Sequence, residues 1–159
     1  MKQKVLDQAL TILELPAWLD ILASRTNKRL QSNCSFLQDN LGFTLNGYSF
    51  NWGQNDPYLY PPIIQKFKIL LKVREDNAEE ILIIPNWKGQ VQSRWIQAMK
   101  MAEVDLGEVN DCLEMGQVMK YLHQQLAPGR MKAIRLASMR YENTYQEKLV
   151  NALDLMMKL

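Results

Sequence analysis

The chain has 159 residues, of which 47% are hydrophobic and 23% are charged, and its formal net charge at pH 7 is +2. This length allows one domain with a hydrophobic core and is short for two, and the composition excludes an intrinsically disordered chain. The small net charge does not by itself require a nucleic-acid partner.

Metal sites and cysteine nucleophiles have little support in the sequence. It contains two cysteines, Cys34 and Cys112, and one histidine, His123. A structural zinc site needs four ligands in paired spacing, so we expect no metal site. A cysteine–histidine nucleophile pair would need distant residues to meet, and isolated cysteines are more often small, buried apolar residues.

The expected compartment follows from what the sequence lacks. No run of 18 apolar residues and no signal peptide is found in it. We therefore expect an intracellular protein, cytoplasmic or nuclear, in a reducing compartment and without a membrane span.

The first half of the chain predicts one helix and several short strands. Apolar residues recur at helical spacing over residues 2–15, and Pro16 ends this helix. The polar residues 25–47 predict irregular structure. Three short strands are predicted, at 18–24, 48–52 and 58–60, and the last of them is ended by two prolines.

From residue 63 onward, helices and strands alternate, which makes α/β the expected fold class. The clearest strand is 81–84, four consecutive apolar residues closed by Pro85, and the lack of alternation indicates a strand covered on both faces. Residues 131–138 fit either a strand or a helix. Helices are predicted at 63–73, 91–101, 115–126 and 141–159.

The last predicted helix, 141–159, has apolar residues on one side and reaches the final residue without a capping residue. We expect it to form a separate C-terminal unit beside a domain at 1–140. Such an amphipathic helix is typical of a docking element for a protein partner or for a second copy of the chain.

Four pieces of the sequence, taken in order, resemble one known family. They are LDILASRTNKRL (19–30), GYSFNWGQNDPYLYPPI (47–63), ILIIPNWKGQVQSRW (81–95) and LGEVNDCLEMG (106–116). Together they resemble the segment that follows the RNase H domain in polyproteins of DIRS-type, tyrosine-recombinase retroelements. That segment is similar to Dam-class DNA adenine N6-methyltransferases, whose catalytic loop reads Asn-Pro-Pro-Tyr or Asp-Pro-Pro-Tyr.

The resemblance implies a Rossmann-like methyltransferase fold over residues 1–140, with a mostly parallel sheet and flanking helices. Ligands of such sheets lie outside the carboxyl ends of the strands. By their match to the family pattern, Asp20 and Asn27 would lie near S-adenosylmethionine. Tyr60, Pro61 and Pro62 would form the catalytic loop.

The catalytic loop departs from the family pattern at two positions. In an adenine N6-methyltransferase the first loop residue accepts a hydrogen bond from the exocyclic amine, and an aromatic residue after the prolines stacks on the flipped base. Here these positions are Tyr60 and Ile63, and the chain contains no Gly-x-Gly loop. A phenol is a poor acceptor and isoleucine has no aromatic face, so we expect the turn to be present without methyl transfer.

Several candidate residues have two readings. Asp20 would either bind a cofactor hydroxyl or accept backbone N–H groups at the end of a strand. Asn27 would more simply form an Asx turn. Trp52, Trp87 and Trp95 are more often core residues than stacking platforms, although Trp87 follows a strand exit, where a ligand site is plausible.

Two basic clusters are candidates for nucleic-acid contact, although solvated surface is the more common reading. They are Arg25, Lys28 and Arg29, and Arg130, Lys132 and Arg135.

Three functions remain open from the sequence. The first is a non-catalytic, methyltransferase-like module of retroelement origin that acts in interaction or as a scaffold, with or without nucleic acid, and needs no cofactor. The second is an active adenine methyltransferase that uses S-adenosylmethionine. The third is a small structural subunit of a larger assembly that docks through 141–159.

Overall fold

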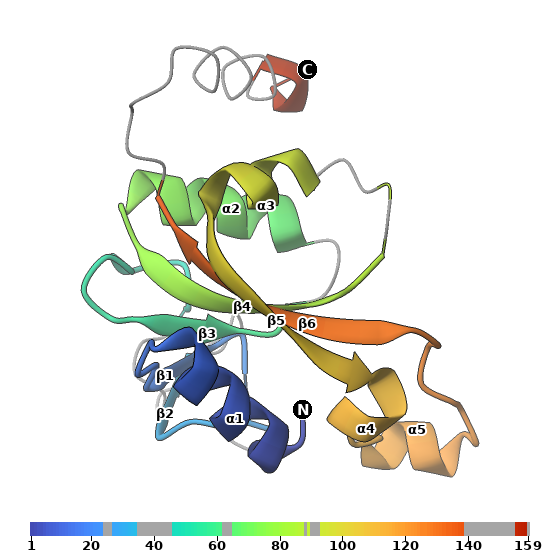
Figure 1. The fold of residues 1–159 in the computed structure, drawn as a ribbon. Helices are drawn as coiled ribbons and strands as arrows, with labels where there is room; N and C mark the ends of the chain where they lie inside the picture. The colour runs from blue at the N-terminus through green and yellow to red at the C-terminus, as the bar shows by residue number, and fades with distance from the viewer. Residues whose placement is uncertain are drawn as a thin grey trace.

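The computed structural model describes residues 1–23, 27–34, 46–61, 65–87, 89, 93–138 and 155–158. These residues form a mixed α/β fold with one six-stranded sheet and helices on both of its faces (Figure 1). None of these helices is long and apolar enough to cross a membrane. The strands are β1 (Leu19–Ile21), β2 (Ser32–Cys34), β3 (Pro57–Leu59), β4 (Glu79–Pro85), β5 (Lys100–Glu108) and β6 (Arg130–Ala137), and the helices are α1 (Gln3–Leu13), α2 (Lys66–Glu75), α3 (Ser93–Met99), α4 (Val109–Cys112) and α5 (Gln117–Tyr121).

The sheet is mostly parallel, as predicted from the sequence. Its strand order is β2-β1-β3-β4-β6-β5, and β2, β1, β3 and β4 are paired in parallel. Strand β6 is antiparallel to both of its neighbours, β4 and β5. Because the four parallel strands point the same way, the carboxyl ends of β1, β3 and β4 lie at one edge of the sheet.

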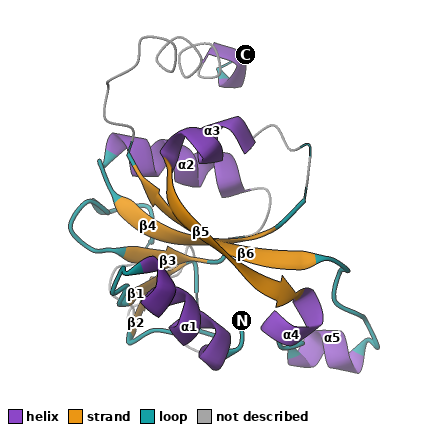
Figure 2. Ribbon diagram, in the orientation of Figure 1, coloured by secondary structure: helices purple, strands orange, loops and turns teal. Residues whose placement is uncertain are grey.

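The sheet separates two layers of hydrophobic core, and helices cover both of its faces (Figure 2). One layer, which includes Leu82 and Trp95, lies on the side of α2 and α3. The other includes Tyr58 and Ile83 and lies on the side of α1 and α4. Successive residues of β4 alternate between the two layers, and this double coverage explains why residues 81–84 are all apolar.

Strand β1 is shorter than the predicted 18–24. Its last residue is Ile21, and Leu22 has a φ of 72°, in the left-handed region that non-glycine residues seldom adopt. The backbone N–H of Leu22 donates to the carbonyl oxygen of Cys34 at 2.7 Å. The chain therefore turns out of the sheet directly after β1.

The strand predicted at 48–52 is wrong. The backbone N–H of Trp52 donates to a carboxylate oxygen of Asp76 at 2.8 Å, and the indole N–H donates to the carbonyl oxygen of Gly47 at 2.8 Å. Trp52 is completely buried. These two hydrogen bonds take the place of backbone pairing with a neighbouring strand. The segment is therefore a loop that packs around the buried Trp52.

Two strands were not predicted. Residues 32–34 were expected to be irregular but form β2, where the buried amide of Asn33 donates to the carbonyl oxygen of Ala23 at 3.0 Å. The helix predicted at 91–101 ends at Met99, because Lys100 already pairs with β6 as the start of β5. The alternation of apolar and polar residues at 102–106 is a strand signal that sequence analysis missed, and Val104 and Leu106 pack against the core on the side of α1.

The other predicted elements agree with the structure to different degrees. Residues 131–138, for which strand and helix were both open, are strand β6 up to Ala137. Of the helix predicted at 115–126, only α5 is helical. The helix predicted at 141–159 lies outside the described residues except for 155–158, of which 155–157 are helical. It remains a prediction, as does the boundary between the two units.

A carboxyl group is buried at the start of β4. Glu80 is 0% exposed, and neither of its carboxyl oxygens has a hydrogen-bond partner among the described residues. Burial disfavours the charged form and raises the pKa of Glu80 well above its ordinary value of 4.5. Above pH 4.5 the folded protein therefore keeps a proton on Glu80 that the unfolded chain releases. As a result, the free energy of unfolding decreases as the pH rises from 4.5 toward the raised pKa.

We expect Glu80→Gln to raise the free energy of unfolding at pH 7 and to reduce its pH dependence. The variant cannot ionise, so it removes a slope of up to about 1.4 kcal/mol per pH unit between the unfolded and folded pKa values. Urea denaturation followed by tryptophan fluorescence between pH 4.5 and 8 measures this slope. Glu75→Gln, at the exposed end of α2, is the control. An unchanged slope in Glu80→Gln would contradict the prediction.

Candidate functional site

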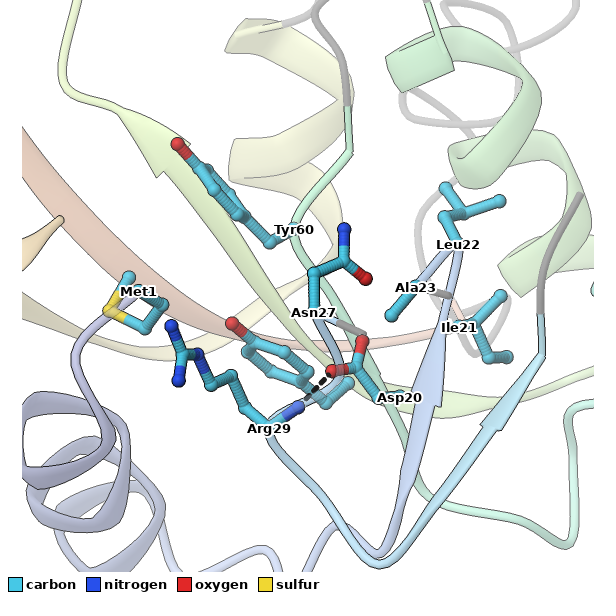
Figure 3. A pocket seen from close by; sticks show the side chains of 9 residues that line it. Met1, Asp20, Ile21, Leu22, Ala23, Asn27, Arg29 and Tyr60 are labelled. Atoms are coloured by element: carbon cyan, nitrogen blue, oxygen red, sulfur yellow. Dashed lines mark hydrogen bonds between the residues drawn. The ribbon is translucent and has the colours of Figure 1, made fainter. Parts of the chain in front are cut away.

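Two cavities lie at the carboxyl ends of the parallel strands. The Asp20 cavity has a volume of about 60 Å³, and residues that line it include Asp20, Leu22, Asn27, Arg29, Tyr58 and Tyr60 (Figure 3). The Trp87 cavity has a volume of about 330 Å³, and residues that line it include Tyr60, Pro61, Pro85, Trp87, Val109 and Pro128. This edge of the sheet is where open α/β folds bind ligands.

Asp20 is buried at the centre of β1. It is 4% exposed, it lies opposite Tyr58 of β3, and one carboxyl oxygen accepts the backbone N–H of Arg29 at 2.7 Å (Figure 3). Burial raises the pKa of Asp20 from 3.8 to about 7, and the opposing effects of the Arg29 backbone N–H and of nearby positive charges are smaller. Asp20 accepts a backbone N–H as predicted, but from the centre of β1 and not from its end, and its cofactor role remains a prediction.

The hydroxyl of Tyr58 adds a second buried polar group to this cavity. Tyr58 is 1% exposed, and its hydroxyl has no hydrogen-bond partner among the described residues. Burial raises the pKa of Tyr58, so the hydroxyl stays neutral. A cavity of about 60 Å³ has room for water, which needs roughly 10–15 Å³. Sequence analysis missed Tyr58, because an aromatic residue in a buried strand is usually core.

Tyr60 and Pro61 directly follow β3, as the predicted loop requires. Tyr60 is 39% exposed and borders both cavities, and its hydroxyl end points away from Asp20 (Figure 3). Partial burial raises the pKa of Tyr60, so at neutral pH the residue presents a neutral phenol. Pro62 and Ile63, which complete the predicted loop, lie outside the described residues.

The Trp87 cavity is apolar. No charged side chain is among the described residues that line it. Trp87 is 40% exposed, whereas Trp52 and Trp95 are buried at 0% and 1%. The core interpretation is therefore confirmed for Trp52 and Trp95 and is wrong for Trp87, because Trp87 lies just beyond β4, where the strand leaves the core.

Asp20 and Asn27, which the sequence assigned to one site, both line the Asp20 cavity. Asn27 is exposed and Asp20 is buried, so they contribute to the rim and to the floor of the cavity. Pockets for small ligands usually begin at roughly 300 Å³. At about 60 Å³, the Asp20 cavity does not fit a nucleoside-sized cofactor such as S-adenosylmethionine.

The candidate nucleic-acid residues do not form one basic surface in the described part of the chain. Lys28 is exposed and donates to the carbonyl oxygen of Gln31 at 2.8 Å, and Arg25 lies outside the described residues. The other four pair with carboxylates: Arg29 with Glu114, Arg130 with Asp105 and Glu108, Lys132 with Glu103, and Arg135 with Glu79.

The basic residues of β6 are also divided between the two faces of the sheet. Arg130 and Lys132 lie on one face of the strand, and Arg135 lies on the opposite face. There Arg135 donates to the carbonyl oxygen of Leu13 in α1 at 3.0 Å. Nucleic-acid binding through these residues remains a prediction.

No group of three side chains suited to hold a metal ion occurs among the residues that the structure describes. Comparison with models of known protein families found no match, and a search of curated proteins found none either. The family resemblance therefore continues to depend on the four sequence pieces.

We expect the backbone amide of Arg29 to titrate with a midpoint near pH 7, because its N–H donates to the buried carboxyl of Asp20. Amide chemical shifts recorded between pH 4 and 9 measure this midpoint. Asp20→Asn keeps an oxygen acceptor but cannot ionise, so the transition should be absent in that variant. A midpoint near pH 4 in the wild type would mean that Asp20 is hydrated and not buried.

Proposed function

We propose that this chain is a non-catalytic, methyltransferase-like domain of retroelement origin that acts as an interaction or scaffold module. The observation that carries the proposal is Tyr60. It directly follows β3, at the position where the family resemblance expects an amide or carboxylate acceptor, and it is a neutral phenol whose hydroxyl end points away from Asp20 (Figure 3).

The sheet supports a Rossmann-like methyltransferase ancestry. Its last strand, β6, is inserted antiparallel between β4 and β5, next to an otherwise parallel array. The resemblance implies a mostly parallel sheet with flanking helices, and the sheet of this chain has that form. The predicted catalytic loop also follows a central parallel strand, β3, at the ligand-binding edge.

Loss of catalysis is supported by acceptor chemistry and by space. The exocyclic amine of adenine needs a strong acceptor if its lone pair is to be directed at a methyl donor, and a phenol is a weak one. The cavity beside Asp20, where the resemblance implies S-adenosylmethionine, is about 60 Å³. We derive no methyl-transfer step for this chain.

An interaction role is supported by exposed apolar side chains around α5. Large exposed apolar residues that cluster on a surface often mark protein contacts. The residues in and next to this helix are Met115 (38% exposed), Val118 (71%), Tyr121 (83%) and Leu122 (54%). Nucleic-acid association is a weaker part of the proposal, because most of the described candidate cations are paired with acids.

Two other functions make different predictions. An active adenine methyltransferase would bind S-adenosylmethionine, and a structural subunit that docks through 141–159 would show a mass that depends on concentration. Removal of 141–159 followed by sedimentation analysis tests the subunit hypothesis.

Calorimetric titration with S-adenosylmethionine and S-adenosylhomocysteine tests the proposal. We expect no heat and no thermal shift at ligand concentrations up to about 1 mM. The cavity beside Asp20, where the resemblance implies the cofactor, is about 60 Å³ and is below ligand size, and the larger Trp87 cavity has no charged side chain among its described lining residues to bind the charged methionine part. Binding of either ligand at micromolar strength would contradict the hypothesis of a non-catalytic domain. Methyl transfer to unmethylated DNA would then be measured.

A further inference from the structure

Tyr60 lines both the Asp20 cavity and the Trp87 cavity, and no other described residue lines both. We propose that the Tyr60 ring is a steric partition that divides one crevice along the ends of β1, β3 and β4 into two compartments. In this way Tyr60 determines the size and the chemistry of the ligands that the edge of the sheet accepts. The inference uses one part of the proposed function, namely that the wild-type chain does not bind S-adenosylmethionine.

The two compartments differ in chemistry. The Asp20 side offers hydrogen-bonding groups: the carboxyl of Asp20, the side chain of Arg29, and the buried hydroxyl of Tyr58, which has no partner among the described residues. The Trp87 side offers proline rings and the half-exposed indole of Trp87, with no charged side chain among its described lining residues.

A ligand that spanned both compartments would need a hydrogen-bonding group at one end and a planar, uncharged ring at the other. Nucleosides have this chemistry, with ribose hydroxyls beside a flat base. Neither compartment alone provides both kinds of contact, so with the ring in place such a ligand can make only one of the two kinds.

Tyr60 is suited to a truncation experiment. It is 39% exposed, and no described residue is hydrogen-bonded to its hydroxyl. Removal of the ring therefore leaves no buried polar partner unsatisfied, and the backbone between β3 and Pro61 is unchanged. Tyr60→Ala should keep the fold while it joins the two cavities.

Adenosine, without a charged tail, is the probe. Calorimetric titration should show binding to Tyr60→Ala that is at least about tenfold tighter than to the wild type. Two controls should behave as the wild type does: Tyr60→Phe, which keeps the ring, and Tyr121→Ala, which removes a tyrosine that is 83% exposed and lines neither cavity. Adding Tyr58→Phe to Tyr60→Ala should weaken the gain, because the ligand then loses the buried hydroxyl.

Each outcome decides the inference. A folded Tyr60→Ala that gains no affinity overturns it, and so does an equal gain in Tyr60→Phe, because the ring would then not be the barrier. Circular dichroism and urea denaturation establish folding, and Tyr60→Ser makes the same truncation if Tyr60→Ala does not fold. Binding of S-adenosylmethionine to the wild type contradicts the proposed function, whereas a lack of gain on truncation contradicts only the partition.

Discussion

The pairing of β4 on both of its edges is the constraint on which the rest of the structure depends. β4 pairs in parallel with β3 and, over all seven of its residues, antiparallel with β6. Both of its faces are covered by core, so the helices must lie on both sides of the sheet. The same pairing brings the ends of β3 and β4 together, and the Trp87 cavity forms where they end.

The parts of this fold that could be predicted are those with a local signal. Helix α1 has helical periodicity and a following proline, and β4 is a continuous apolar run. Strand β2 has no such signal, because it is three residues long and its buried Asn33 depends on a hydrogen bond to the carbonyl oxygen of Ala23. Strand β5 has a short alternation at 102–106, but its start at Lys100, directly after α3, is set by long-range pairing with β6 and cannot be read from a window of sequence.

The candidate site shows the same division. The resemblance brought Asp20, Asn27 and Tyr60 to one edge of the sheet, and the structure places all three around the Asp20 cavity. The resemblance could not show that the buried hydroxyl of Tyr58 has no partner among the described residues, or that Trp87 is half-exposed. Both facts depend on how distant segments pack around the ends of β3 and β4. The buried acids Asp20 and Glu80 also show that this small domain tolerates costly polar groups in its interior.

The direction of β6 has a consequence for how this domain can be joined to other proteins. Because β6 is antiparallel to β4, it begins beside Pro85, near the cavities, and ends beside Glu79, at the far side of the sheet. The backbone N–H of Ser138 donates to the carbonyl oxygen of Ala78 at 3.1 Å, just before β4 starts. At residue 138 the chain is thus anchored at the edge opposite Tyr60, so a tether attached there starts from the side of the sheet away from the cavity mouths.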